Sequence, residues 1–193
     1  MERSTYSVPC IRRRTGTFDA EHPLSVSVPG SKSITNRALL LATLAEGTST
    51  LSGVLFSDDS RHFLSCIQTL GFDTSVDEAA RTIRVTGLGG QLPKKEASLY
   101  VGSAGTAARF LSAYLGLSRD GTYHMESSAQ MQKRPMAPLL DSLKSLGCEI
   151  TYQGEEGHFP FTLKGHGFLR DRITISIEES SQFLSALLIV SCL

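Results

Sequence analysis

Three short segments of this chain combine small residues and hydroxyl groups in a way that suits the binding of anions. They lie at residues 30–33, 102–106 and 180–182, each between a segment that resembles a strand and a run that resembles a helix. The first turn of a helix has backbone N–H groups without partners and a partial positive charge, so it attracts phosphate or carboxylate. Three such turns on one rim predict a ligand with several negative charges.

Cations strengthen this interpretation for the first segment. Lys32 lies in the turn itself, and Arg37 follows Ser33 by four residues, which places the two on the same face of a helix. The alternative is plain capping, because Ser and Thr are preferred at helix starts whatever the function. A lysine beside free N–H groups favours anion binding.

Residues 130–135 add a cationic pair to the start of a further expected helix, where Pro135 suits the first helical position. A cation such as Arg134 is unfavourable at a helix start unless an anion also lies there, although a surface arginine is the alternative. The corresponding helix of the first half begins with Asp58 and Asp59. These two acids complement the helix dipole, and we interpret them as structural.

The sequence also contains an internal repeat. Residues 110–113 (FLSA) recur 73 positions later at 183–186, and Arg37 precedes Arg109 by 72 positions. Each unit has the pattern strand, helix, strand, helix, hairpin, so the fold class is α+β. The expected strands are 24–28, 48–55, 99–101, 122–126 and 173–177, the first helices are 35–44 and 107–117, and the hairpins join 73–76 to 82–86 and 149–153 to 161–164.

These units predict the domain organisation. An amino-terminal segment, 1–22, precedes a substrate-binding domain, 23–193, made of units 23–93 and 98–165 and a partial third unit, 172–193. Gly71 and Gly147 fit the left-handed position after the second helix of each complete unit. Because the third unit stops inside its first helix, we expect the natural domain to be longer and a second domain to be absent from this chain.

Composition narrows the function classes. Nineteen basic residues balance nineteen acidic ones in 193 residues, so no overall field favours nucleic acid or an anionic membrane. The four cysteines lack the close spacing of metal or redox motifs, and the five histidines are scattered, so we expect no metal site. No segment resembles a membrane span or an export signal, which predicts a cytoplasmic protein.

Two longer strings resemble the signatures of the 5-enolpyruvylshikimate-3-phosphate synthase family. They are VPGSKSITNRAL at 28–39 and GSAGTAAR at 102–109, followed in the family's order by Arg134-Pro135 and SSQFL at 180–184. The resemblance implies helices inside and sheets outside, as in enolpyruvyl transferases. It also implies transfer of the enolpyruvyl group of phosphoenolpyruvate to the 5-hydroxyl of shikimate 3-phosphate, with release of phosphate, in the shikimate pathway. The family uses no metal or organic cofactor and is expected to be monomeric at full length.

The resemblance implies a role for each matching residue. In shikimate 3-phosphate, Ser33 and Arg37 would hold the carboxylate, Ser180 and Ser181 the phosphate, and Gln182 would touch both substrates. The residues implied for phosphoenolpyruvate are Gly105, Thr106 and Arg134. Lys32 would bridge the two ligands and is the candidate for proton transfer.

Two departures and two alternatives remain. Ser103 stands where many members have asparagine, which leaves tolerance of glyphosate-like inhibitors open, and members are roughly twice as long, so this chain is expected to be inactive alone. One alternative is the related transferase acting on UDP-N-acetylglucosamine, but Ser33 follows Lys32 where that enzyme has asparagine, and no cysteine lies between Cys66 and Cys148. The other is an inactive fragment that only binds a phosphorylated metabolite.

Overall fold

The first unit packs two helices on one face of a small sheet. The computed structural model describes residues 28–170 and 172–192, so residues 24–27 of the first expected strand lie outside the described residues. Helix α1 (Lys32–Leu44) leads into β1 (Glu46–Ser52), α2 (Asp58–Thr69), β2 (Thr74–Asp77) and β3 (Thr82–Leu88). The three strands are antiparallel in the order β1-β3-β2, and the expected hairpin is confirmed.

The second unit begins with a strand, then repeats the order helix, strand, helix, hairpin of the first, and has a larger sheet. Strand β4 (Glu96–Tyr100) is followed by α3 (Gly105–Gly116), β5 (Arg119–Glu126), two short helices and the hairpin of β6 (Glu149–Tyr152) and β7 (Phe161–His166). The sheet order is β4-β5-β7-β6, and β4 runs parallel to β5. A parallel pair needs a crossover, which α3 supplies.

The second helix of this unit departs from the sequence prediction. The structure has two pieces, α4 (Ala129–Gln132) and α5 (Ala137–Ser145), in place of one helix that begins at Pro135. Pro138 lies in the first turn of α5, and Met136 is its N-cap residue. Pro135 therefore precedes the helix, and the residue before a proline is disfavoured in helical conformation, which separates α4 from α5.

The third unit contributes one helix to the described structure. Helix α6 (Ser181–Val190) packs against α3. The strand expected at 173–177 is wrong, because residues 172–179 are not in a strand and form no backbone ladder with any described residue. Alternating Ile and Ser or Thr residues favour a strand, but a strand forms only where a neighbour accepts its backbone hydrogen bonds.

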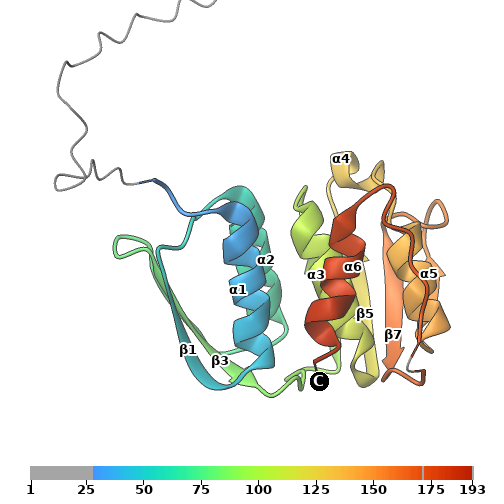
Figure 1. The fold of residues 1–193 in the computed structure, drawn as a ribbon, viewed down its shortest axis with the longest axis horizontal. Coiled ribbons are helices and arrows are strands. Elements are labelled where there is room, and N and C mark those ends of the chain that lie inside the picture. Colours follow the sequence, from blue (N-terminus) through green and yellow to red (C-terminus); the bar gives the residue numbers. More distant parts are fainter. Residues whose placement is uncertain (1–27, 171, 193) are drawn as a thin grey trace, which may run out of the picture.

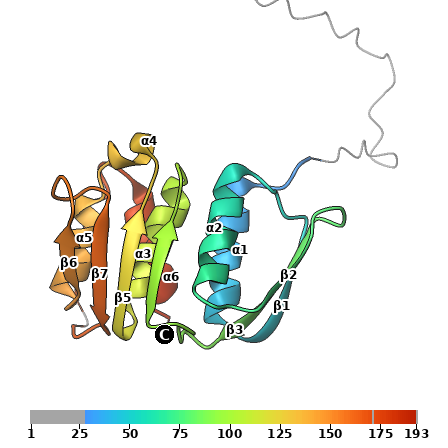
Figure 2. The ribbon, with the colours of Figure 1, turned by 180° about the vertical axis from the view of Figure 1, so that it is seen from behind.

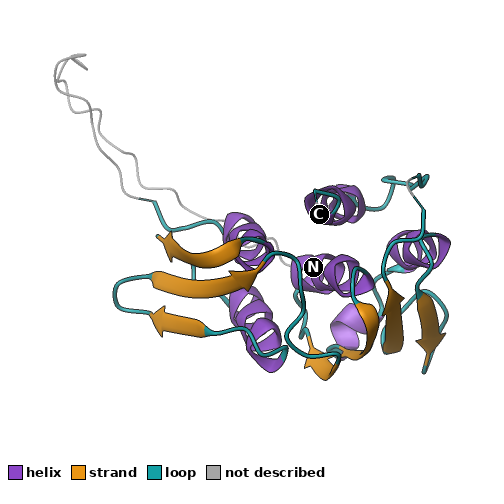
Figure 3. Ribbon diagram, turned by 90° about the horizontal axis from the view of Figure 1, so that it is seen from below, coloured by secondary structure: helices purple, strands orange, loops and turns teal. Residues whose placement is uncertain are grey.

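Each sheet carries helices on one face, as Figures 1 and 2 show from opposite sides and Figure 3 shows along the helices: α1 packs on the first sheet, α3 and α5 on the second, and α6 on α3. One continuous core joins the layers, and its largest fully buried side chains include Tyr114, Tyr123, Phe63, Phe110, Phe161 and Phe183. This confirms the expected α+β class with helices inside and sheets outside. Within the described residues, the helices are all too short or too polar to cross a membrane.

Both second helices end as their glycines predict. Gly71 has φ 95° after α2, and Gly147 has φ 112° after α5. Only glycine adopts this left-handed conformation without steric cost, so both chain reversals depend on it.

Candidate functional site

Three helix starts lie at one end of the molecule. Helices α1, α3 and α6 all begin at the upper end in Figure 1, and α3 contacts both of the others. Each of the three follows one of the segments that the sequence singled out. Their N-terminal partial charges therefore point the same way, as expected for a shared anion site.

At the first of these starts, Lys32 is already engaged by an acid. Ser31 caps α1 by accepting a hydrogen bond from the backbone of Ile34 at 3.4 Å, and the Lys32 Nζ lies 3.1 Å from the Asp59 Oδ2 of α2. Asp59 therefore does more than complement its own helix. It holds the lysine side chain at the rim, and because the lysine is half-exposed the ion pair contributes little to stability.

Arg37 lies one turn further along α1, on the face shared with Ser33. Its Nη1 donates to the Ser33 carbonyl at 3.1 Å, and its guanidinium lies over the Phe110 ring at 5.1 Å from the centroid. The predicted i, i+4 relation is therefore present. A guanidinium over a ring face still presents its remaining N–H groups at its own edge, in its own plane, where an anion can accept them.

The start of α3 is the least satisfied of the three. Its N-cap residue is Ala104, and no side chain caps the helix, whereas Ser31 and Ser180 cap α1 and α6. Gly105 and Thr106, in the first turn, are both buried. Capping by hydroxyls, the alternative that the sequence left open, therefore does not account for this segment.

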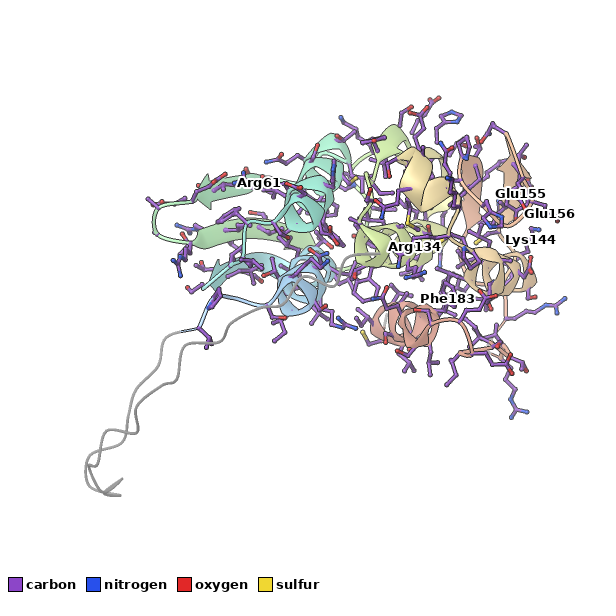
Figure 4. The ribbon with its side chains drawn as sticks, turned by 90° about the horizontal axis from the view of Figure 1, so that it is seen from above. Arg61, Arg134, Lys144, Glu155, Glu156 and Phe183 are labelled. Carbon is purple, nitrogen blue, oxygen red and sulfur yellow. The ribbon has the colours of Figure 1, made fainter. Side chains whose placement is uncertain are left out.

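Arg134 comes to this helix start from the segment after α4, where Figure 4 labels it among the helix ends. A methyl group on Gly105 would lie 2.7 Å from the Arg134 Nη1 and 3.2 Å from the Arg109 Nη1. Arg134 does not open a helix of its own, as the sequence had suggested, because it follows the C-cap of α4 at Lys133. Arg134 instead lies beside the start of α3, where Gly105, which has no side chain, leaves space for its guanidinium.

Gln182 joins the third segment to the second. Ser180 caps α6 by accepting from the Gln182 backbone N–H at 3.2 Å, and Ser181 is exposed. The Gln182 Oε1 accepts a hydrogen bond of 2.7 Å from the Arg109 Nη1. The second and third helix starts are thus directly connected.

The site carries an excess of positive charge. In the described ranges, no ion pair engages Arg37, Arg109 or Arg134. Burial, and after it the neighbouring charge of Arg134, lower the pKa of Arg109 to about 10, against a smaller opposite effect of the nearby Glu179. Burial and the charge of Arg134 both disfavour the charged form of Arg109. An anion bound between the two side chains would stabilise both positive charges.

Sequence reasoning missed the roles of three residues. Arg109 was noted as a repeat partner of Arg37 and as the last residue of the string at 102–109, but no role was assigned to it. Asp59 was interpreted as structural, although it reaches Lys32. Ser103 donates to or accepts from the Ser128 hydroxyl at 2.7 Å, which ties the start of α3 to the N-cap of α4 and which no spacing rule predicts.

A hollow of about 930 Å³ lies at the opposite end of the molecule, at the carboxyl ends of α3 and α6. Its lining includes Leu117, Phe168, Val190, Arg119 and Arg172. Helix carboxyl ends carry partial negative charge, so these cations complement the helices rather than mark an anion site. No cluster of His, Cys, Asp or Glu suited to a metal ion occurs among residues 28–170 and 172–192.

Comparison with known proteins identifies the family. The family model of EPSP synthase (3-phosphoshikimate 1-carboxyvinyltransferase) matches residues 22–193. The chain belongs to the EPSP synthase family. A 3-phosphoshikimate 1-carboxyvinyltransferase from Trichormus variabilis is 41% identical over 187 residues, and the match covers 97% of this chain and 42% of that relative. The chain therefore corresponds to a part of longer EPSP synthases.

Solved structures agree with this family. The EPSP synthase from Acinetobacter baumannii matches with a TM-score of 0.76 and 28% identity, over 86% of this chain and 37% of that one. The enolpyruvyl transferase NikO from Streptomyces tendae matches with a TM-score of 0.55 at 14% identity, over 88% of this chain and 38% of the other, which shows a common fold alone. The resemblance noted from the four sequence motifs is confirmed at the level of family and fold.

Proposed function

We propose that this chain is the amino-terminal, substrate-binding part of an EPSP synthase, which transfers the enolpyruvyl group of phosphoenolpyruvate to the 5-hydroxyl of shikimate 3-phosphate. The observation that carries the proposal is the uncapped, buried start of α3, with Arg134 beside Gly105 and without an ion-pair partner among the described residues. A ligand phosphate or carboxylate would satisfy both the N–H groups and the guanidinium.

The proposed binding roles follow the three helix starts. Ser33 and Arg37 hold the carboxylate of shikimate 3-phosphate, and Ser180 and Ser181 bind its phosphate. Gln182 contacts both substrates, since its side chain lies at the junction of α3 and α6. Each donor comes from a rigid helix, which supports precise positioning.

Phosphoenolpyruvate would occupy the start of α3. Gly105 and Thr106 supply backbone N–H groups there, and Arg134 supplies a guanidinium. Lys32 bridges the two ligands and is the catalytic candidate for proton transfer. To do so it must exchange the Asp59 carboxylate for a ligand anion, which its half-exposed position permits.

This arrangement suits the proposed reaction. Addition to the enol carbon and the elimination that follows build up and remove charge on a centre that carries phosphate and carboxylate. Prearranged N–H and cationic groups lower such barriers by electrostatics and orientation. We further propose that the substrate-binding domain consists of units 23–93, 98–165 and 172–193. The full-length protein is proposed to be monomeric and cytoplasmic.

Calorimetry tests the shikimate 3-phosphate site. We expect Lys32→Ala or Arg37→Ala to weaken binding of shikimate 3-phosphate by roughly 1.5–3 kcal/mol, the range for hydrogen bonds to charged groups. The matched control is Arg84→Ala, at an exposed position of β3 outside the site. Equal affinities of all four proteins would contradict the assignment.

A second candidate function is binding of the phosphorylated substrate without turnover, which the helix starts with Arg37 and Arg134 would support by themselves. Phosphate release by the chain alone would exclude this alternative. Binding without phosphate release, even after addition of the carboxyl-terminal remainder of a relative, would support it.

A further inference from the structure

Arg109 connects two of the three helix starts from a buried position. Only 4% of the residue is exposed, and its Nη1 donates to the Gln182 Oε1 at 2.7 Å. Its guanidinium also lies over the ring of Phe183, the next residue of α6, at 4.8 Å from the centroid. Figure 4 labels Phe183 on α6, where this stacking occurs. Arg109 therefore holds both the amide and the neighbouring ring of α6.

No acid explains the burial of this cation. Among the described residues, no carboxylate lies within ion-pair distance of Arg109, and its Nε is buried without a hydrogen-bond partner. Arg134, a like charge, lies close by, since a methyl group on Gly105 would be 2.7 Å from its Nη1 and 3.2 Å from the Arg109 Nη1. Burying an unpaired guanidinium is unfavourable, so stability alone is a poor reason for an arginine at this position.

The hydrogen bond determines which end of the Gln182 amide faces outward. An amide has one oxygen that accepts and one NH₂ group that donates, whereas a guanidinium only donates. With the oxygen turned to Arg109, the NH₂ group remains available. The reverse orientation would set donor against donor, so Arg109 excludes it.

We propose that Arg109 is a positioning residue, which fixes the Gln182 amide so that its NH₂ group donates to the anionic ligand between the helix starts. The inference rests on the proposed function for the identity of that ligand. The orientation of Gln182 itself depends only on the contact with Arg109. Arg109 acts through Gln182 and needs no contact with the substrate.

The orientation can be tested without ligand by NMR of the side-chain amides. The Gln182 NH₂ signals are assigned by their loss in Gln182→Leu. In Arg109→Met we expect them to move to the values of a free glutamine side chain, and in Arg109→Lys, which keeps a charge and a donor, to move less. Signals that do not move in either variant would overturn the proposal. Where Arg109→Met does not fold, the result for Arg109→Lys alone decides.

A double-mutant cycle tests the consequence for binding of shikimate 3-phosphate to the 193-residue chain. We expect Arg109→Met and Gln182→Leu each to weaken binding roughly tenfold, and the double variant to weaken it roughly tenfold as well, because both remove the same interaction. Losses that multiply to roughly a hundredfold would overturn action through Gln182.

Two further measurements distinguish a specific role of Arg109 from a general effect of altering α3, and from failure of the proposed function. Ser112→Ala removes a buried hydroxyl from the same helix, where it donates to the Ala108 carbonyl, and should leave the affinity unchanged. An equal loss in this control would show a general effect of altering α3 and would overturn the positioning role. If the unmodified chain binds no shikimate 3-phosphate, the proposed function fails, and the amide signals alone decide whether Arg109 orients Gln182.

Discussion

Gly105 lies where the side chains of Arg109 and Arg134 converge on the start of α3. The space of one methyl group separates the helix from both guanidinium groups. Position 105 therefore controls how closely Arg134 approaches the free N–H groups, and with it the proposed phosphoenolpyruvate site. The same distance also explains why glycine is needed without any appeal to backbone conformation, since φ is not in the left-handed region.

Gly105→Ala should displace Arg134 and weaken the binding of phosphoenolpyruvate. We expect its KM to rise roughly tenfold in the chain reconstituted with the carboxyl-terminal remainder of a relative, as for the loss of one charged hydrogen bond. Gly154→Ala is the matched control, because its added methyl group meets only ordinary contacts. A KM that stays at the original value in Gly105→Ala would place phosphoenolpyruvate elsewhere.

Among the secondary-structure elements, the β6–β7 hairpin carries a cross-strand cluster of charged side chains away from the helix starts. Glu149 of β6 accepts a hydrogen bond from the His166 Nε2 at 2.9 Å and lies 3.5 Å from the Lys164 Nζ. These contacts hold the pKa of Glu149 below its ordinary value of 4.5, and the hydrogen bond from His166 has the largest effect. A lowered carboxyl pKa stabilises the fold above the unfolded value, and this contribution is lost as the pH falls through the folded value.

Glu149→Gln should therefore lower the melting temperature at neutral pH and change it little in acid. Because Glu149 is exposed, we expect a small difference, which shrinks as the pH falls below 4.5. Thermal melting between neutral and acid pH measures it, with Glu96→Gln of β4 as an exposed control without an ion pair among the described residues. A constant difference at every pH would assign the effect to packing.

Sequence periodicity predicted elements well wherever local signals and tertiary partners agree. The helix expected at 35–44 is present and begins earlier, at Lys32, because Ser31 caps it. The strand expected at 173–177 failed, since alternation describes a side-chain pattern and cannot supply the neighbouring strand. Pro135 was placed at a helix start one short turn too early, because Pro138 fills that position in α5.

The site was predictable only in part, because local sequence patterns do not specify which elements contact one another. Spacing along one helix correctly related Ser33 to Arg37. The contact between Arg109 and Gln182 joins residues of different units, and that between Lys32 and Asp59 joins different helices. Such contacts depend on how helices pack, which periodicity does not encode.

At the scale of the whole molecule, the chain spans about two fifths of the length of its relatives. The described residues, 28–170 and 172–192, contribute helix starts and cations from one side. Many enzymes complete their catalytic groups only when two parts close over the substrates. We therefore propose that these groups bind the substrate anions and that the acid–base chemistry needs a further part of the enzyme.

We expect no phosphate release from the chain alone and turnover once the carboxyl-terminal remainder of a relative is added. The reason is that the proposed proton transfer by Lys32 needs an acid–base partner beyond the groups on this face. A coupled phosphate assay measures both states, and a preparation with Lys32→Ala controls for contaminating enzyme. Turnover by the isolated chain that Lys32→Ala abolishes would contradict the need for a second part.

We propose that three separate helix starts form one site, with shikimate 3-phosphate at α1 and α6 and phosphoenolpyruvate at α3. Titration of the ¹⁵N-labelled chain with the two ligands in turn tests this most directly, because each backbone amide reports separately. We expect shikimate 3-phosphate to shift the amides of 31–37 and 180–183 with one common affinity, phosphoenolpyruvate, added next, to shift those of 102–106, and neither to shift Gly90, Arg119 or Phe168 around the opposite hollow. Shifts confined to that hollow, or to a single helix start with both ligands, would contradict the proposal.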